Sequence, residues 1–314
     1  MVEYFKTEAG RIVRTTGAEE GCWINLVRPS SEELAKVISE TGAEEDFIRA
    51  ALDPEESSRV EIEEDQTLLI VDIPTIEKEK EHEESARIFS TLPMGILVLP
   101  NQVVTVCLQD SVVLRSIADN MVKDIHTSMK TRFVFQILLR VAGRFLKNLR
   151  LIERDFTKIE QRLYDSLKNE ELIQLLGLSK SLVYFSASLK GNEVTMEKVL
   201  RGRILKLYED DRDILEDALI EIRQAIEMAG IYSSILSGTM DAYASVVSNN
   251  LNIIMKVLAV ITIIMSVPNI IFGFYGMNIT GSPIPFAGWW WAPIVITAIG
   301  CFAAWFYMKR KDLM

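Results

Sequence analysis

Residues 257–308 read VLAVITIIMSVPNIIFGFYGMNITGSPIPFAGWWWAPIVITAIGCFAAWFYM, and this stretch decides the fold. It contains no charged side chain. A helix that crosses a membrane needs about 20 consecutive apolar residues. Two segments meet this requirement, at about 256–276 and at 289–308, and a short loop at 279–288 joins them. We therefore predict a hairpin of two transmembrane helices.

Basic residues lie on one side of this hairpin. Lys256 precedes the first helix, and Lys309, Arg310 and Lys311 follow the second, whereas the loop has neither Lys nor Arg. Cytoplasmic flanks of membrane helices carry an excess of Lys and Arg. Residues 1–14 are polar and lack the apolar core of a signal peptide. We expect a multi-pass protein of the cell membrane, with both termini and the basic tail at 309–314 in the cytoplasm.

The chain before the hairpin is predicted to hold a cytosolic α/β domain at 1–128. Hydroxyl residues followed by acidic ones after Pro29 indicate a helix start at Ser30. A second short helix is expected at 44–52. Alternating or continuous apolar runs predict strands, and a charged loop is expected at 77–84. The predicted strands lie at 22–27, 59–63, 68–73, 95–99 and 103–108.

The next part of the chain has helical periodicity without proline. A helical region is predicted at 129–202, with a break at Gly191 and Asn192. A stalk helix is predicted from 203 to 278 that continues directly into the first transmembrane helix. The fold class is thus an α+β membrane protein with long stalk helices.

Composition excludes several functions. The formal net charge of −10 disfavours nucleic acid as a partner and favours cations. The three cysteines lie far apart, and the two histidines, His82 and His126, form no ligand or catalytic cluster with them. The chain has no nucleotide-binding P-loop motif. We therefore expect neither an enzyme nor a nucleotide-driven machine.

Small and polar residues follow one face of the first transmembrane helix, and we call them the polar stripe. A face of this kind avoids lipid, so it forms either a helix-packing seam or the lining of a pore. Asn269, in the middle of the span, favours the pore. Two helices cannot enclose a channel, so the pore requires several copies of the chain. The polar stripe comprises Asn252, Ala259, Thr262, Ser266, Asn269, Gly273 and Gly276.

The tetrapeptide Tyr275-Gly276-Met277-Asn278 ends this span and resembles the signature of the CorA magnesium transporters. The segments at 23–26, 59–61 and 248–258 and the basic C-terminus are similar to that family as well. The resemblance covers the whole chain in order. It implies a funnel-shaped homopentamer in which the first span lines the pore and the second forms an outer ring, with Mg²⁺ as both the transported and the regulatory ion.

The resemblance also implies roles for particular residues. Gly276, Met277 and Asn278 would form the selectivity filter, with the Asn278 amide contacting the hydration shell of the ion. Lys256, Lys309, Arg310 and Lys311 would form a basic collar, and Asp217 with Asp213 would bind regulatory metal. The implied pore lining is Asn252 at the cytoplasmic mouth, Met255 and Leu258 as a hydrophobic constriction, and Thr262, Ser266, Asn269 and Gly273 above it.

Several alternatives stay open at this point. Asp210, Asp213, Asp217 and Glu221 share one helix face, which is either a solvated surface or a divalent-cation site. The outer loop carries no acidic residue, which weakens the attraction of cations to the mouth. The ion could be Mg²⁺, Co²⁺ or Ni²⁺, and a zinc or other metal transporter or exporter is the alternative. The second alternative is a membrane-anchored sensor or scaffold that conducts no ion.

Overall fold

The computed structural model describes residues 1–77, 87–166, 169–202, 204–205, 208–277 and 290–311. The chain divides into two compact units, Met1–Gly238 and Thr239–Met314. We call these the first and the second unit and describe each by itself.

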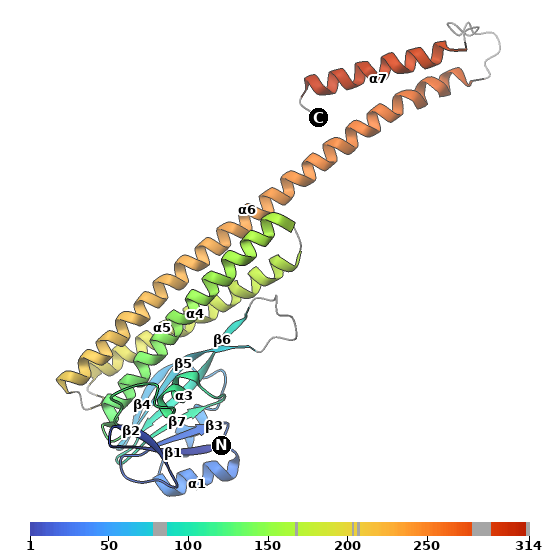
Figure 1. Ribbon diagram of the computed structural model, residues 1–314. Coiled ribbons are helices and arrows are strands. Elements are labelled where there is room, and N and C mark those ends of the chain that lie inside the picture. Colours follow the sequence, from blue (N-terminus) through green and yellow to red (C-terminus); the bar gives the residue numbers. More distant parts are fainter. Residues whose placement is uncertain (78–86, 167–168, 203, 206–207, 278–289, 312–314) are drawn as a thin grey trace. The chain divides into compact units, whose positions relative to one another are not determined.

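The first unit contains a seven-stranded mixed sheet (Figure 1). Its strands are β1 (Val2–Glu8), β2 (Arg11–Thr15), β3 (Trp23–Val27), β4 (Arg59–Glu63), β5 (Gln66–Ile76), β6 (Phe89–Val98) and β7 (Val103–Cys107). Their order across the sheet is β2-β1-β3-β7-β6-β5-β4. The pair β3–β7 is parallel, with Trp23 opposite Val103, and the other neighbouring pairs are antiparallel.

The strands predicted from alternation and apolar runs are confirmed as β3 to β7, but β5 and β6 are longer than predicted, and β6 begins six residues earlier, at Phe89. The first two strands were not predicted. In β1, the adjacent Tyr4 and Phe5 are both buried, so the sequence does not alternate cleanly. In β2, at the edge of the sheet, Ile12 alone is buried. These strands depend on pairing with β3 and with each other, which a local pattern does not contain.

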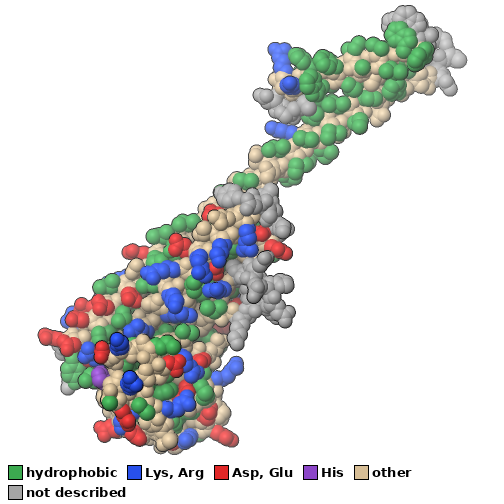
Figure 2. Space-filling view, viewed as in Figure 1, with side chains coloured by type: hydrophobic (Ala, Val, Ile, Leu, Met, Phe, Trp, Pro, Cys, Tyr) green, Lys and Arg blue, Asp and Glu red, His purple; other side chains and the backbone are tan. Residues whose placement is uncertain are grey.

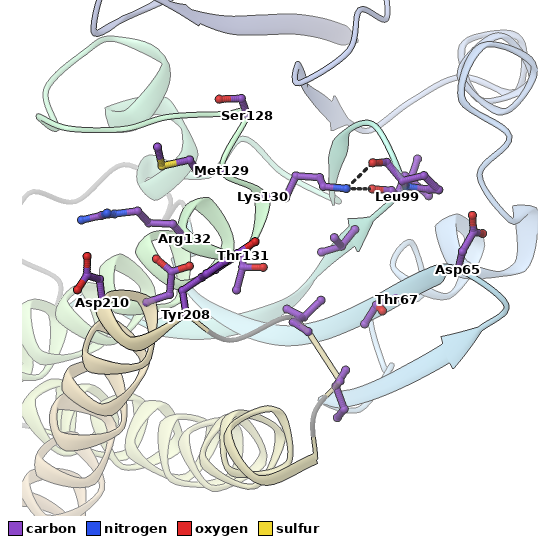
Figure 3. Close-up of a pocket in the computed structure, with 15 residues that line it drawn as sticks. Asp65, Thr67, Leu99, Ser128, Met129, Lys130, Thr131, Arg132, Tyr208 and Asp210 are labelled. Atoms are coloured by element: carbon purple, nitrogen blue, oxygen red, sulfur yellow. Dashed lines mark hydrogen bonds between the residues drawn. The ribbon is translucent and has the colours of Figure 1, made fainter.

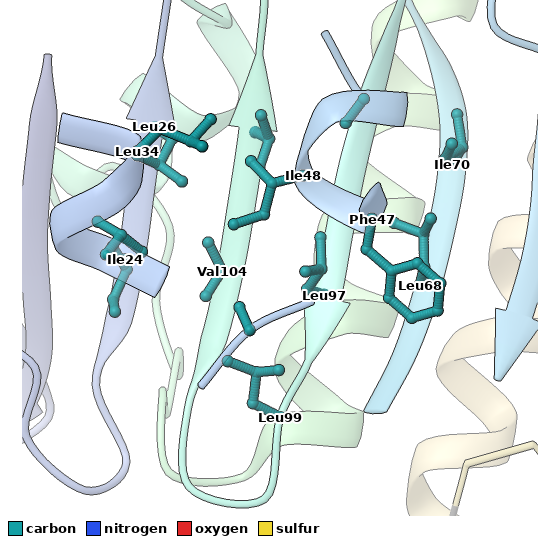
Figure 4. Close-up of a cluster of buried hydrophobic side chains, with 14 of the residues drawn as sticks. Ile24, Leu26, Leu34, Phe47, Ile48, Leu68, Ile70, Leu97, Leu99 and Val104 are labelled. Carbon is teal, nitrogen blue, oxygen red and sulfur yellow. The ribbon is translucent and has the colours of Figure 1, made fainter. Parts of the chain in front are cut away.

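Two short helices cover one face of the sheet, α1 (Ser31–Thr41) and α2 (Glu45–Ala50). The predicted helix start is confirmed: Ser30 accepts a hydrogen bond from the Glu33 amide, and the Glu33 carboxylate accepts one from the Ser30 amide. Buried side chains of both helices meet the sheet in a single apolar cluster (Figure 4). The labelled members are Ile24, Leu26, Leu34, Phe47, Ile48, Leu68, Ile70, Leu97, Leu99 and Val104.

Longer helices cover the other face, α4 (Lys130–Ser166) and α5 (Asn169–Gly202), and the short α3 (Val112–Ala118) packs beside α4. Trp23 of β3 lies against Phe133 of α4, with ring centroids 5.4 Å apart. Phe185 of α5 contacts Phe89 of β6 at 5.9 Å and Phe145 of α4 at 5.1 Å, both edge to face. These aromatic contacts join the sheet to the helical layer.

The break predicted at Gly191 and Asn192 is wrong, because α5 continues to Gly202. Asn192 is fully buried, and its amide bonds both the N–H and the C=O of Asp72 in β5, each at 2.8 Å. It also accepts a hydrogen bond from Ser58 at 3.0 Å. A Cβ on Gly191 would lie 3.1 Å from the Ser58 hydroxyl. These two residues dock the helix closely on the sheet and do not end it.

Helix α6 spans Glu209–Tyr275 and belongs to both units. It begins at Glu209 rather than at 203. In the first unit it runs parallel to α4. Two contacts show this direction: Gly143 faces Glu221, and further along both helices the Tyr232 hydroxyl donates to Glu153 at 2.9 Å. Its buried residues there are Asp211, Leu215, Ala218, Leu219, Ile222, Ala225, Ala229 and Leu236.

Among the described residues, three helices are long and apolar enough to cross a membrane. Two are α6 and α7 (Ala292–Arg310), which contain most of the predicted transmembrane segments: α6 ends at Tyr275, and α7 begins three residues later than predicted. The third is α5, at Glu170–Gly202. Because α5 packs on β5, β6 and α4 through side chains such as Phe185, its apolar character serves the core of the first unit.

Candidate ion pathway and regulatory carboxylates

The second unit consists of the later part of α6 and the helix α7. Figure 2 shows mainly hydrophobic side chains over these helices, whereas acidic and basic side chains cover the visible face of the first unit. Pro293 lies in the first turn of α7, where no intrahelical donor is lost. Lys309 and Arg310 lie in its last turn, where cations favour the helix dipole, and the Lys309 ammonium lies 5.1 Å from the Trp305 ring centre.

One side of α6 packs against α7, and we call it the α7-contact stripe. A Cβ on Gly300 would lie 2.9 Å from Val267 Cγ1, and the Cys301 thiol donates to the Ile264 carbonyl at 3.7 Å. Val260 is buried on the same side. The stripe comprises Val260, Ile264, Val267, Pro268, Ile271 and Tyr275, which are buried or half-buried.

The polar stripe lies on the opposite side of α6. At about 3.6 residues per turn, the positions of the two stripes are roughly half a turn apart. Asn252, Ala259, Thr262, Asn269, Gly273 and Gly276 are exposed, and Ser266 is half-buried. Within the described part of a single chain, the polar stripe is therefore not the seam between α6 and α7. A packing seam with another copy and a pore lining remain as its possible roles.

The hydroxyls of the polar stripe are satisfied within their own helix. Thr262 donates to the Leu258 carbonyl at 2.8 Å, and Ser266 donates to the Thr262 carbonyl at 2.8 Å. Asn269 forms no hydrogen bond with any residue that the structure describes, and its side chain is exposed. An amide without a partner in a membrane-spanning helix requires water, an ion shell or another chain.

Residues at the two ends of the span extend this face. Met255 and Leu258 are exposed and follow the helical period of the polar stripe, whereas Lys256 points away from it. At the other end, the Gly276 amide donates to the Phe272 carbonyl at 2.9 Å. Gly276 and Met277 are exposed beyond the last helical residue. Asn278 and the predicted outer loop lie outside the described residues.

The acidic residues of α6 in the first unit do not behave as one group. Asp210, Asp213 and Asp217 are exposed. Glu221 is turned toward α4, and its buried Oε2 lies 3.2 Å from the position of a Cβ on Gly143. Burial, followed by the charge of Asp217, raises the pKa of Glu221, and nearby arginines oppose this. Glu221 shares the helix face predicted for these carboxylates, but its side chain is half-buried against α4 and is not part of a solvated surface.

Asp211, which was not predicted as a site residue, is buried, with 6% of its surface exposed. Burial raises the pKa of this carboxyl, and the charge of Arg132 on α4 opposes the shift. Asp211 lines a cavity of about 680 Å³ between the starts of α4 and α6 and the turns of the sheet (Figure 3). No pattern in the sequence signals this cavity, because its walls come from segments near 65, 99, 130 and 208.

The cavity has a mixed lining. Lys130 points across it to donate to the carbonyls of Leu99, at 2.8 Å, and Pro100. Burial lowers the pKa of Lys130. Within the described residues, no group of three or more His, Cys, Asp or Glu side chains is placed to hold a metal ion. The described part of a single chain therefore offers no complete carboxylate cage, either in the cavity or at Asp213 and Asp217.

The described residues thus form a mixed α/β unit with long helices and, later in the chain, two packed helices that are apolar enough to cross a membrane. Comparison with known proteins gives the family. Residues 18–310 match the model of the CorA-like Mg²⁺ transporter protein family, and the chain belongs to it. This is a family of metal-ion transporters rather than of enzymes, and its members are membrane proteins.

Two named proteins illustrate the similarity. The cobalt/magnesium transport protein CorA of Methanocaldococcus jannaschii is 29% identical over 271 residues, which are 83% of this chain and 81% of that protein. The complete structure of the CorA magnesium transporter from the same organism matches with a TM-score of 0.85 at 23% identity, covering 100% of this chain and 99% of that one. The full-length CmaX protein matches with a TM-score of 0.72 at 15% identity, covering 99% of this chain and 97% of that one.

Proposed function

We propose that the chain forms a homopentameric pore through which hydrated Mg²⁺ crosses the cell membrane passively. The observation that carries this proposal is the position of the polar stripe on α6, opposite the side that packs on α7. In a ring of copies with α7 outside, the polar stripes face a common axis. Family membership and the magnesium and cobalt named for the M. jannaschii relative support the choice of ion.

The proposed lining suits an ion that keeps its water. Mg²⁺ demands octahedral geometry and dehydrates reluctantly, so amide and carbonyl oxygens that accept from its waters suit it better than direct ligands. Asn269 is such an exposed amide in mid-span. Asn278, with Gly276 and Met277, is proposed as the outer selectivity filter. No carboxylate lies in the span to hold the ion too tightly.

The membrane potential is the proposed driving force. A doubly charged ion gains about 4.6 kcal/mol per 100 mV of inside-negative potential, so uptake needs no nucleotide. Met255 and Leu258 are proposed to form the hydrophobic constriction below the lining, with Asn252 at the cytoplasmic mouth. Lys256 with Lys309, Arg310 and Lys311 forms a basic collar on the cytoplasmic side, which fits both termini being cytoplasmic.

The main test is magnesium flux into liposomes that contain the purified protein, followed with a dye inside them. We expect Asn278→Ala to reduce the initial rate at least about tenfold, because the ring loses the dipoles that replace bulk water around the ion. Asn249→Ala is the matched control, since Asn249 precedes the span and lies off the polar stripe. Equal rates for Asn278→Ala and the wild type would refute the proposed filter.

Parallel flux measurements with Mg²⁺, Co²⁺, Ni²⁺ and Zn²⁺ identify the cargo. Faster entry of Zn²⁺ than of Mg²⁺ would refute magnesium as the main cargo and identify the protein as a zinc transporter. Flux of no divalent ion at all would favour a non-conducting sensor. If the protein is monomeric in detergent and in nanodiscs, the proposed pore is excluded, because one hairpin encloses no lumen.

Regulation by cytosolic Mg²⁺ at Asp213 and Asp217 is the second part of the proposal. Both carboxylates are exposed on α6, and the described residues of one chain complete no metal site there, so the remaining ligands would come from a neighbouring copy. Bound Mg²⁺ would hold the ring closed, and its loss would let the like charges separate the copies.

Limited proteolysis with and without Mg²⁺ tests the regulatory site. We expect Asp217→Asn to weaken the protection that Mg²⁺ gives, whereas Glu227→Gln, an exposed carboxylate off this face, leaves it intact. Protection that is unchanged in Asp217→Asn would exclude Asp217 from the site.

A further inference from the structure

Pro268 leaves one carbonyl of the membrane helix without its normal partner. Proline has no backbone N–H, so the C=O of residue i−4, which is Ile264, receives no intrahelical bond. Within lipid no water replaces that donor. The helix nevertheless continues through Pro268 to Tyr275.

The opposite helix supplies the missing donor. The Cys301 thiol of α7 donates to the Ile264 carbonyl at 3.7 Å. This hydrogen bond joins α7 to the carbonyl that Pro268 leaves without an N–H donor. Thiols are weak donors, so the bond is modest, but it meets a carbonyl with no competing N–H.

The residue before Cys301 permits this approach. A Cβ on Gly300 would lie 2.9 Å from Val267 Cγ1, closer than side chains tolerate, and 3.8 Å from Ile271 Cδ1. Gly300 and Cys301 therefore contact α6 on both sides of Pro268, along the α7-contact stripe. Ordinary apolar packing explains the glycine but not a thiol aimed at the one carbonyl that proline releases.

We propose that Gly300 and Cys301 position the proline segment of α6, and through it Asn269 on the opposite face. The inference rests on the proposed function, because it makes the outer helix a determinant of how the mid-span amide faces the ion. Cys301 contacts no ion and is a positioning residue. Its loss would let the helix bend or rotate at Pro268 and displace the neighbouring Asn269.

A double-mutant cycle in the full-length protein in liposomes tests this. Cys301→Ala should lower magnesium flux about two- to fivefold, the range that one weak hydrogen bond is worth. Cys301→Ser, which keeps a donor, should restore it. In a Pro268→Ala background, residue 268 supplies its own N–H to Ile264, so Cys301→Ala should have no further effect. Thr297→Val is the control, because Thr297 bonds only within α7, to Pro293.

An infrared measurement separates the contact from transport. The S–H stretching band of Cys301, isolated by subtracting the Cys301→Ala spectrum, should lie at the lower frequency of a bonded thiol. It should move toward the free frequency in Gly300→Ala, where the added methyl pushes α7 away. A free-thiol band in the wild type, or an equal loss of flux from Cys301→Ala in both backgrounds, would overturn the inference. A bonded band in a protein without flux would refute the proposed function instead.

Discussion

The two parts of α6 bury and expose opposite kinds of side chain. In the first unit, the helix buries apolar side chains such as Leu215 and Ile222 against its neighbours and exposes charged ones. In the second unit, apolar side chains such as Ile261 and Phe272 are exposed, and the small and polar residues form a narrow stripe. One uninterrupted helix therefore carries two opposite patterns, which are suited to water and to lipid.

Because of this difference, a polar side chain indicates something different in each unit. In the first unit, a polar side chain on the surface is solvated, and the core supplies the free energy of folding. In the second unit, lipid covers the apolar surface, so burial between helices gains little, and a polar side chain in mid-span needs a specific partner. Asn269 thus points to function, whereas most of the charges at the start of the helix do not.

The largest expected effect compares phenylalanines in the two units. Phe185→Ala should lower the free energy of unfolding by about 3–5 kcal/mol, because the ring is fully buried between Phe89 and Phe145. Phe272→Ala should change it by less than about 1 kcal/mol, because lipid replaces the contacts of a ring that is 49% exposed. Chemical denaturation of the full-length protein in detergent measures both. Similar losses would show that Phe272 is packed between copies.

The second prediction concerns transport. Asn269→Leu should reduce magnesium flux about tenfold or more, because a branched apolar side chain replaces the amide that we propose contacts the hydrated ion. Ile261→Leu, also exposed in the span but off the polar stripe, is the matched control and should leave flux unchanged. Equal flux in Asn269→Leu and the wild type would show that the polar stripe is a packing seam and not a pore lining. The thermal midpoint of the oligomer would then fall instead.

The sequence predicted the parts of the fold that rest on local patterns. The capping box at Ser30 and Glu33, the apolar strand around Leu69 and the two apolar segments each carry their signal within a few residues. The strand β1 and the continuation of α5 through Asn192 depend on partners far along the chain. In the sequence alone, Gly191 followed by Asn192 resembles a helix end. Their packing against the sheet explains why the helix continues.

The same limit applies to the candidate site. Periodicity found the polar stripe, but the side that α7 covers became known from Gly300 and Cys301. Helical spacing placed Glu221 with Asp217, yet the approach of α4 at Gly143 turns Glu221 inward. The roles of Asn278, Asp213 and Asp217 stay predictions. Spacing defines a face of a helix, and the packing of other elements decides what that face meets.

The smallest effect expected is a pH dependence at Glu221, where the part of α6 in the first unit departs from its own pattern of exposed charges. Burial raises the pKa of Glu221 in the folded protein above its ordinary value. Protonation then favours the folded state, so this group's contribution is favourable at acid pH and is lost as the pH rises through the raised pKa. Glu221→Gln removes the charge and should raise Tm near pH 8 by a few degrees at most, with little change near pH 4.

Melting curves at several pH values, in EDTA to exclude bound cations, measure this difference. Asp213→Asn is the control, because its side chain is exposed on the same helix and lacks the contact with Gly143. Asp217→Asn should shrink the effect of Glu221→Gln, since the charge of Asp217 contributes to the raised pKa. A Glu221→Gln variant that is less stable than the wild type at pH 8 would mean that the carboxylate has a stabilising partner, such as an arginine of α4. Glu221 would then belong with the solvated or paired charges of the first unit.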